Sequence, residues 1–300
     1  MTVLDAESAA LIAAQTLRER ALAVRLGQEF GNLDAYRRIL RRVEIDADDA
    51  PRLRDFYALY EGIFTLAEER ESFEGFETVL RFNADLRLQA EFGPFRELVT
   101  LVYEPGRSGP VGAANFILYA YPTTLGGFQG SAQLNFLCVD EERRGAGIAG
   151  VLLADLDRRV AAFARAHARI AASKTFITCE QNNPERMTDE ELRADARAAL
   201  IDPHQRLSWW RARGYRKLDF PYRQPPLDPE RKPCNYVDYF VRLQQEVGHT
   251  QSSIPSVVLV EHIRRYFYVS IGKFDFDMSK NPEWLLQIVI LKRNNHINVL

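Results

Sequence analysis

Apolar and polar residues alternate along the first half of the chain with spacings that predict both helices and strands. The Ala-rich segment 5–29 repeats its apolar positions every three to four residues and stops near Gly27 and Gly31, which favour a helix end. Pro and Gly residues between 105 and 110 predict a turn between two apolar runs. The predicted elements are, in order, a helix over 5–29, a strand over 42–46, helices over 51–64 and 73–90, and strands over 98–103 and 111–121.

The second half of the chain continues this mixture of elements. An apolar run over 134–139 predicts a strand, and the apolar positions from Val151 to Phe163 have helical spacing. The remaining predicted elements are, in order, a helix to about Ala168, a strand over 170–179, a variable helical stretch up to Trp209, and strands through Phe220 and over 236–243. This order indicates an α/β (α+β) fold.

Small residues fill the turn between strand 134–139 and the helix that follows it. Three glycines and two alanines stand between Gly145 and Gly150. Residues without bulk let a ligand approach the backbone, and the first amides of a helix have no partner inside the helix. Together with the positive end of the helix dipole, these features predict a binding site for a phosphate or pyrophosphate.

Two well-known phosphate-binding loops do not account for this turn. A Walker loop needs Lys-Ser or Lys-Thr after the glycines, and neither follows here. Gly145, Gly147 and Gly150 fit the Gly-x-Gly-x-x-Gly spacing of dinucleotide-binding folds, but that motif belongs to the first strand of a parallel sheet, early in a domain. The alternative to a ligand site is a helix start built of small residues only for close packing.

The sequence from Arg144 to Leu153 resembles motif A of the GNAT superfamily, the acetyl-CoA-dependent N-acetyltransferases. That motif is Arg/Gln-x-x-Gly-x-Gly/Ala, and Arg144, Gly147 and Ala149 stand at its defining positions. The similarity extends to the end of the preceding strand and to a leucine pair in the following helix. It implies a GNAT-like central sheet, mixed and mostly antiparallel, flanked by helices, with extra helical segments at both ends of the chain.

The resemblance also implies acetyl-CoA as the co-substrate. The backbone amide of Val139 is expected to face the thioester oxygen or the pantetheine arm. The residues expected to hold acetyl-CoA are Leu137, Val139, Arg144, Gly145, Ala146, Gly147, Ile148, Ala149 and Gly150.

The reaction that the resemblance implies is direct attack of a primary amine on acetyl-CoA in a ternary complex, which requires an amine that has lost its proton. Some relatives carry a glutamate six residues before the valine, where this chain has Gln133, which can orient water but is not a base. Glu180, at the end of the next strand, is the ionisable substitute, unless it is only an exposed strand-end carboxylate. Glu69 and Glu71, between the first two helices of the implied fold, are further candidates.

A second similarity lies at residues 210–215, where many GNAT members carry Tyr-x-x-x-Gly-Phe. Gly214 and Tyr215 match its end, and a glycine between a helix and a strand suits a helix end. Trp210 replaces the tyrosine that often protonates the departing CoA thiolate, and an indole N–H is far too weak an acid for that role. Another group or solvent then supplies the proton, and Trp210 packs the pocket.

Composition and charge exclude several other classes of function. The 39 basic and 41 acidic residues nearly balance, so neither nucleic acid nor an anionic membrane is an expected partner. Cys138, Cys179 and Cys234 form no metal-binding array, the five histidines show no zinc-binding spacing, and no serine stands in a hydrolase elbow. No signal peptide and no membrane-spanning run are visible, so a cytoplasmic protein is expected.

Residues outside the minimal family fold suggest a division of the chain. An N-terminal helical extension over 1–40 precedes a GNAT-like domain over 41–245, with an insertion near 184–201 and a C-terminal extension over 246–300. The charges of the insertion predict either an acidic lid that favours a cationic amine or a solvated helix face. The apolar C-terminal extension is expected to pack on the domain or on a second subunit, as in a homodimer.

The function expected from the sequence is acetyl transfer to the amine of a small molecule or peptide. A degenerate GNAT module, which binds CoA or acyl-CoA as a sensor or scaffold without turnover, is the alternative that Gln133 and Trp210 motivate. Transfer of a longer acyl group is a third possibility.

Overall fold

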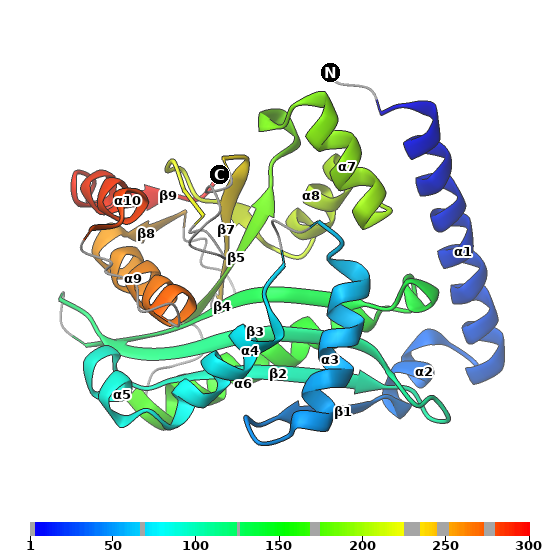
Figure 1. The fold of residues 1–300 in the computed structure, drawn as a ribbon, viewed down its shortest axis with the longest axis horizontal. Coiled ribbons are helices and arrows are strands. Elements are labelled where there is room, and N and C mark those ends of the chain that lie inside the picture. Colours follow the sequence, from blue (N-terminus) through cyan, green and yellow to red (C-terminus); the bar gives the residue numbers. More distant parts are fainter. Residues whose placement is uncertain are drawn as a thin grey trace.

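The computed structural model describes residues 4–66, 70–124, 127–168, 175–224, 235–244, 252–272 and 280–300. A seven-stranded sheet forms the centre, with helices on both of its faces (Figure 1). The strands are β1 (Arg41–Ile45), β2 (Phe95–Tyr103), β3 (Pro110–Pro122), β4 (Phe128–Val139), β5 (Thr175–Asn182), β6 (Arg216–Lys217) and β7 (Val237–Leu243). They lie in the order β1-β2-β3-β4-β5-β7-β6, and β4–β5 is the parallel pair in an otherwise antiparallel sheet. The predicted fold class is confirmed.

One face of the sheet is covered by α6 and by the N-terminal helices. These helices are α1 (Ala6–Phe30), α2 (Leu33–Ile39) and α6 (Ile148–Ala168). Alternate residues of β3 and β4, among them Phe116, Leu118 and Leu134, meet Leu152 and Leu156 of α6 in one buried cluster. Every second residue of a strand and every third or fourth residue of a helix point to the same side, so these apolar positions face one another.

The opposite face carries two groups of helices. Over β1–β3 lie α3 (Ala50–Ile63) and α4 (Phe73–Arg81), followed by η2 (Phe82–Ala84) and α5 (Leu86–Phe92). Over the β4–β7 half lies α9 (Ser256–Gly272), with α10 (Pro282–Lys292) packed on it (Figure 1). Leu259, Ile263 and Phe267 of α9 are fully buried. The C-terminal segment therefore packs on the sheet, while Leu285, Leu286 and Val289 of α10 stay 44–46% exposed.

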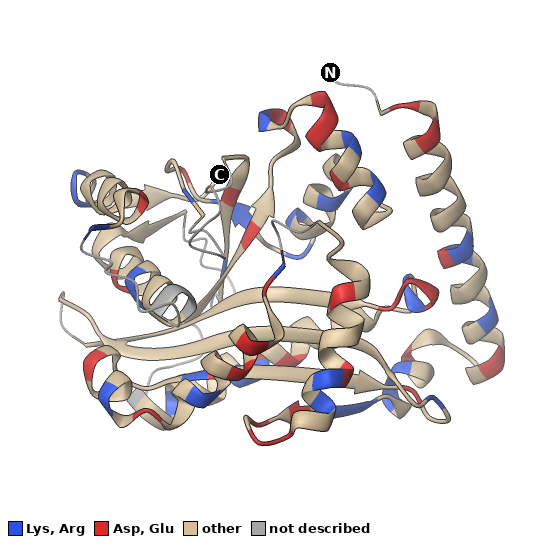
Figure 2. Cartoon of the chain, in the orientation of Figure 1, with Lys and Arg blue, Asp and Glu red and all other residues tan. Residues whose placement is uncertain are grey.

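Shorter elements complete the chain after β4. These are η3 (Glu141–Arg143), η5 (Pro184–Arg186), α7 (Asp189–Ala199) and α8 (Pro203–Arg211). In addition, β8 (Ser253–Pro255) and β9 (His296–Asn298) form a separate antiparallel pair. Acidic and basic residues are both distributed along the helices (Figure 2). Among the described residues, no helix combines the length and the apolar character needed to cross a bilayer.

The single helix predicted over 73–90 is wrong, because the chain breaks it in two. The Asn83 side chain bonds both backbone groups of Glu97 on β2, at 2.7 and 2.9 Å. Asp85 then caps α5 by accepting from the amides of Arg87 and Leu88. Asn and Asp favour such local bonds over a continuous helix, and the sequence pattern of apolar positions did not reveal them.

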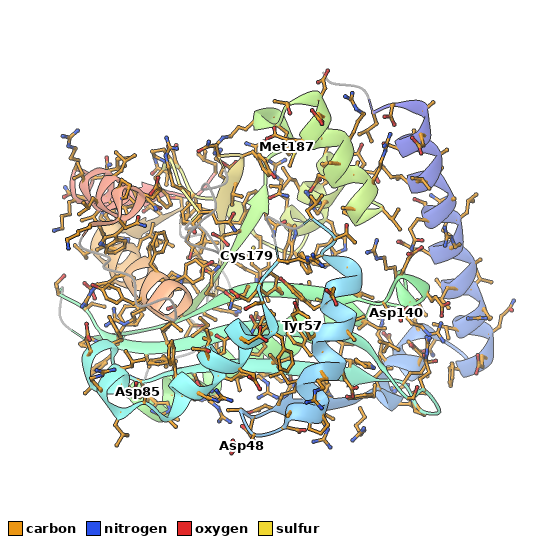
Figure 3. The ribbon with its side chains drawn as sticks, viewed as in Figure 1. Asp48, Tyr57, Asp85, Asp140, Cys179 and Met187 are labelled. Carbon is orange, nitrogen blue, oxygen red and sulfur yellow. The ribbon has the colours of Figure 1, made fainter. Side chains whose placement is uncertain are left out.

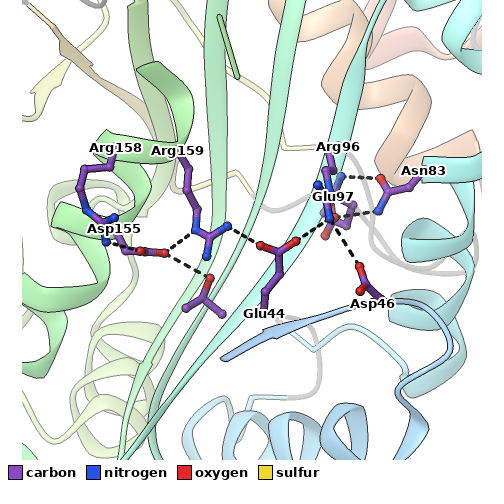
Figure 4. Close-up of polar contacts among 9 residues, drawn as sticks. Glu44, Asp46, Asn83, Arg96, Glu97, Asp155, Arg158 and Arg159 are labelled. Atoms are coloured by element: carbon purple, nitrogen blue, oxygen red, sulfur yellow. Dashed lines mark hydrogen bonds and ion pairs between the residues drawn. The ribbon is translucent and has the colours of Figure 1, made fainter. Parts of the chain in front are cut away.

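An ionic network with the buried Asp155 at one end ties α6 to the first two strands (Figure 4). Asp155 of α6 is 3% exposed and pairs with Arg158 and Arg159, and Arg159 also pairs with Glu44 of β1. Arg96 of β2 continues the network to Glu44. Because each buried charge has an opposite partner, the network fixes α6 relative to β1 and β2 and thereby places the loop at the start of α6.

Candidate functional site: a cavity where β4 and β5 separate

The parallel strands β4 and β5 pair over only part of their length. Residues 130–134 pair with 175–179, and among the described residues no strand partner of β4 follows on that side. A β-bulge contributes to the separation, because Asn115 of β3 pairs with Phe136 and Phe116 pairs with Leu134, which leaves Asn135 as the extra residue. Bulges bend a strand and re-aim its side chains. The result is an open edge of β4 from Asn135 to Val139.

A cavity of about 230 Å³ lies at this separation. Figure 3 shows Cys179 near the point where the two strands part. The lining residues come from α4, α8 and α9, from β2 to β5 and β7, and from the segments that follow α3, precede α4 and follow β6: Phe64, Glu71, Gly75, Phe76, Val79, Glu97, Asn115, Leu134, Asn135, Phe136, Leu137, Cys179, Glu180, Gln181, Asn182, Arg206, Trp210, Gln224, Val237 and Tyr266. Enclosed cavities with an aromatic wall and a few polar groups are typical of small-molecule sites.

Glu180 places its carboxylate in this cavity. Oε1 accepts a hydrogen bond from the hydroxyl of Tyr222, and Oε2 accepts from the hydroxyl of Tyr266 at 2.9 Å and from Nε2 of Gln224 at 3.2 Å. The residue as a whole is half-buried because it faces the cavity, yet its carboxylate is enclosed by these three donors. The alternative of an exposed strand-end carboxylate therefore does not fit the structure.

Burial raises the pKa of the Glu180 carboxyl above its ordinary value, and the hydrogen bonds from Tyr222, Tyr266 and Gln224 oppose that rise. The pKa values of Tyr222 and Tyr266 are raised well above the usual phenol value, chiefly by burial, so both remain protonated donors. A carboxylate with a raised pKa is a stronger base than one in water.

Two further carboxylates make the cavity acidic. Glu71 is 6% and Glu97 is 2% exposed, and both line the cavity together with Glu180. The cationic lining residue Arg206 is held by both oxygens of Asp195, at 2.8 and 3.0 Å. Glu69 lies outside the described residues. Residues 184–201, all of which are described, contribute nothing to the lining, which favours a solvated helix face over an acidic lid.

Gln133 does not share the cavity with Glu180. Its side chain is fully buried on the face covered by α9, where Oε1 accepts from the hydroxyls of Tyr239 at 2.6 Å and Thr178 at 2.7 Å. His262 of α9 completes the cluster through bonds to Ser131 and Thr178. In this structure Gln133 therefore supports the packing of α9 and cannot contact an acceptor in the cavity.

The reason for this placement lies in the register of β4. Gln133 pairs with Ile117 of β3, whereas Val139 pairs with Gly112. Ile117 and Gly112 are five positions apart on one strand, so they point to opposite faces of the sheet. The bulge at Asn135 thus separates two positions that regular alternation would place on the same face.

The glycine loop adopts the conformation that its composition suggests. Gly145 and Gly147 have φ values of +85° and +84°, in the region where a side chain is strained, and α6 begins at Ile148. Asp140, labelled in Figure 3, begins the loop at the end of β4. Gly150 has open space around it in the first turn of α6.

The N-terminal helices lie directly on this loop. A Cβ atom at Gly145 would stand 2.8 Å from the carbonyl oxygen of Glu19 on α1, and one at Gly147 would stand 2.3–2.5 Å from the guanidinium of Arg37 on α2. Arg37 Nε also donates to the carbonyl of Ala146 at 3.1 Å. Close packing therefore accounts for part of the glycine content of the loop.

The other residues expected to hold acetyl-CoA are distributed as follows. Leu137 lines the cavity, and Val139 is half-buried against the core under α6. Ala146 and Ile148 are fully buried, backbone included, so neither reaches the surface in this structure. Arg144 donates to the carbonyl of Ala199 at the end of α7, and Ala149 is half-buried. Within the loop, Gly145 and Gly150 are exposed and Gly147 is half-buried.

Trp210 lines the cavity from α8 and is 6% exposed. Its ring packs edge-on against Trp209 and Tyr215, with centroids 4.9 Å apart in each case. The packing role expected for Trp210 agrees with this geometry. Cys138 is fully buried, and burial raises the pKa of its thiol, as expected for a core cysteine rather than a nucleophile. Within the described part of the chain, no cluster of His, Cys, Asp or Glu is placed to hold a metal ion.

The sequence did not single out Tyr222, Gln224 or Tyr266. These residues follow Glu180 by 42, 44 and 86 positions, and the last belongs to the C-terminal segment. A buried carboxylate needs donors, which is a reason to search for tyrosines, but neither spacing nor motif indicates which of the twelve in the chain supply them.

Comparison with known proteins gives structural similarities only. No family model and no curated protein matches the chain. Similar solved structures include the ribosomal-protein-S18-alanine N-acetyltransferase from Escherichia coli, with 10% identity over 70% of this chain and 99% of that chain and a TM-score of 0.37. A GNAT superfamily phosphinothricin acetyltransferase from Sinorhizobium meliloti in complex with AcCoA has 15% identity over 71% and 92%, with a TM-score of 0.38. The NatC complex bound to Gag peptide and CoA contains a chain with 14% identity over 68% and 98%, also at 0.38. Similarity at this level assigns neither a substrate nor a residue role.

Proposed function

We propose that the protein is an N-acetyltransferase that transfers an acetyl group from acetyl-CoA to a primary amine by direct attack in a ternary complex. The observation that carries this proposal is the enclosed carboxylate of Glu180 beside the open edge of β4. A nucleophilic amine must lose a proton, and a buried carboxylate at the wall of a cavity can accept it. The motif of the glycine loop and the order of the elements support acetyl-CoA as the donor.

The proposed transfer exchanges one bond of the acetyl carbon for another and moves protons to Glu180 and solvent. The amine nitrogen forms a bond to the acetyl carbon while the bond from that carbon to the CoA sulfur breaks. A cationic amine loses two protons in all: Glu180 accepts the first, directly or through water, before the attack, and solvent accepts the second as the amide forms. Trp210 offers no acid for the departing thiolate, so solvent supplies its proton if one is needed. Positioning of the two substrates then contributes most of the rate.

The residues present fit acetyl-CoA in two places. The amides at the start of α6 and the small residues Gly145 to Gly150 suit the pyrophosphate, since α6 has 21 residues and its dipole favours an anion. The open edge of β4 at Leu137 and Val139 suits the extended arm of the donor, because an unpaired strand edge offers backbone groups for hydrogen bonds.

The proposed acceptor is a cationic primary amine on a small molecule or peptide. Glu71, Glu97 and Glu180 give the cavity negative charge, which attracts an ammonium group. Phe76, Phe136 and other aromatic rings form the rest of the wall and suit an apolar body next to the amine.

Release of free thiol from acetyl-CoA, measured across a panel of amines, tests the proposed activity. We expect release that depends on an amine and is greatest for cationic primary amines. Acetylated amine, identified by mass spectrometry, must appear in equal amount. Thiol release that is the same with and without every amine would contradict the proposal.

A charge series at Gly150 tests the cofactor site without disturbing the fold. A side chain at Gly150 meets no atom within 4 Å, and replacing glycine inside a helix favours helix formation. Gly150→Glu places a negative charge near the expected phosphates and should weaken acetyl-CoA binding roughly tenfold, about 1.4 kcal/mol. Gly150→Lys and Gly150→Ala, the matched controls, should bind at least as well as the parent protein. Calorimetric titration measures all three, and equal affinity for the Glu and Lys variants would remove the phosphates from this helix end.

A CoA-binding module without turnover is the second candidate. Two observations favour it: Trp210 offers no acid for the departing thiolate, and Gln133 is buried away from the cavity. This candidate predicts CoA binding with no thiol release for any amine, so the thiol measurement also decides between the two.

A further inference from the structure

Helix α9 reaches the cavity with Tyr266, which lines it, and carries His262 one turn earlier on the same face. His262 and Tyr266 are four positions apart, so they lie one above the other on the helix. Both are at most 3% exposed. Their partners on β5 are Thr178, which contacts His262 at 2.6 Å, and Glu180, which accepts from Tyr266 at 2.9 Å.

The spacing of these pairs matches the geometry of the two elements. Four residues of helix rise about 6 Å, and two residues of strand rise about 6.6 Å. Thr178 and Glu180 are two positions apart and point to the same face of β5. Fixing His262 against Thr178 therefore sets Tyr266 opposite Glu180.

The anchor at His262 is polar, buried and uncharged. One ring nitrogen contacts the hydroxyl of Ser131 on β4 at 2.9 Å, and the other contacts Thr178 and, at 3.0 Å, the hydroxyl of Tyr239 on β7. Burial lowers the pKa of His262 to about 3, so the ring is neutral at ordinary pH. Contacts to three strands at once fix both the rotation and the height of α9.

A second tyrosine holds the other oxygen of the same carboxylate. Tyr222 donates to Oε1 of Glu180 and stacks on Tyr239, with ring centroids 4.5 Å apart and an interplanar angle of 13°. Tyr239 itself bonds Gln133 and contacts His262. The two tyrosines that hold Glu180 are thus both supported by the cluster around His262.

We propose that Tyr266, placed by the His262 anchor, is a positioning residue for Glu180, and that Tyr222 holds the other oxygen of the carboxylate in the same way. This inference rests on the proposed function of Glu180 as the base. Two phenol donors on opposite oxygens fix the plane of the carboxylate. Because Gln224 also donates to Oε2, one lone pair, on Oε1, is left for the amine. The C-terminal segment, which lies beyond the family's implied fold, would then complete the active site.

Hydrogen bonds to an ionised carboxylate favour its charged form, so removing one raises the pKa of Glu180 further. Other titratable or charged groups facing this region come from several elements: Glu71 before α4, Glu97 on β2, Cys179 on β5, Arg206 on α8 and Tyr239 on β7. None of these is changed by a substitution at Tyr266. A shift of the Glu180 titration in that variant can therefore be assigned to the lost hydroxyl.

The test is Tyr266→Phe, with Tyr119→Phe as the matched control. Tyr119 is fully buried in the same core and packs edge-on against His262, but its hydroxyl has no hydrogen-bond partner among the described residues. In Tyr266→Phe the acidic limb of the pH profile of kcat/KM should move up by about one pH unit, with a rate near the parent value above that limb. Tyr119→Phe should leave the limb in place, and Tyr222→Phe should move it in the same direction as Tyr266→Phe.

A second measurement separates this inference from the proposed function. Titration of carbon-13-labelled glutamate by NMR reports the pKa of Glu180 without turnover, and the resonance that disappears in Glu180→Gln identifies it. A raised pKa in Tyr266→Phe, in a protein that releases no thiol with any amine, would keep the positioning role and reject the acetyl transfer. Equal loss of activity at every pH, with no shift of the Glu180 titration, would overturn the positioning role itself.

Discussion

Glu180→Gln is expected to lower kcat for acetyl transfer by about 10²–10⁴-fold, the usual contribution of a positioned base. Glutamine keeps the shape of the side chain: its carbonyl oxygen can accept from one of the two tyrosines, and its amide group can donate to the hydroxyl oxygen of the other. It cannot take the proton of the amine. Affinity for acetyl-CoA should be retained, because the residues proposed to hold the donor are not changed.

The pH dependence gives the same substitution a second, independent readout. The base acts in its ionised form, so kcat/KM of the parent protein should rise with pH through the raised pKa of Glu180. That acidic limb should be absent in Glu180→Gln. Parent-like turnover with an unaltered pH profile would make Glu180 a bystander and leave the deprotonation of the amine to water.

The thermal stability of Glu180→Gln should be equal to or higher than that of the parent protein, although its activity is lower. The pKa of Glu180 is raised in the folded state by burial, so its ionisation opposes folding. This cost is absent below the ordinary carboxyl pKa of 4.5 and grows as pH rises from there through the raised folded value. Glu180→Gln should therefore unfold at the same or a higher temperature than the parent at neutral pH, with the advantage shrinking towards pH 4.

Glu71→Gln is the matched control for charge in the cavity. It removes one carboxylate from the same wall without removing the proposed base. We expect a higher KM for a cationic amine, since the field that attracts the ammonium group weakens, and an acidic limb that stays at the same pH. If Glu71→Gln abolished the limb and Glu180→Gln did not, the two carboxylates would exchange roles.

Local sequence patterns predicted most of the elements, because each is determined by neighbouring residues. The strand over 134–139, the loop after it and the helix from 151 appear as β4, the glycine turn and α6. The break between α4 and α5 was missed because it depends on Asn83 bonding Glu97, a contact with another strand. Helical spacing of apolar residues carries no information about such a contact.

The candidate site was predictable only where it follows from strand order. Glu180 lies at the end of β5, next to β4 in the sheet, so the order of elements alone places it near the expected cleft. To predict where Gln133 lies, one must know the position of the bulge at Asn135. To predict that Tyr266 reaches Glu180, one must know how α9 packs on the sheet. Both depend on tertiary structure that a single sequence does not encode locally.

Gly147→Glu should weaken the binding of acetyl-CoA by on the order of 10²-fold, because it combines bulk with a charge like that of the phosphates. The structure indicates a cost, since φ is +84° and the new Cβ would stand 2.3–2.5 Å from the Arg37 guanidinium. A strained residue of this kind costs about 1–3 kcal/mol.

Gly147→Ala separates the two effects, because it brings the same Cβ and the same backbone strain without the charge. Both variants should lose similar thermal stability, while Gly147→Glu should bind acetyl-CoA roughly tenfold more weakly than Gly147→Ala, a Coulomb difference of about 1.4 kcal/mol. Calorimetry on the folded fraction of each variant measures this difference. Arg37 lies against the same glycine and would pair with the new glutamate, so Gly147→Glu should also be measured together with Arg37→Ala. If the glutamate variant binds as the parent does in either background, the glycine loop serves the packing of α2 and does not hold the donor.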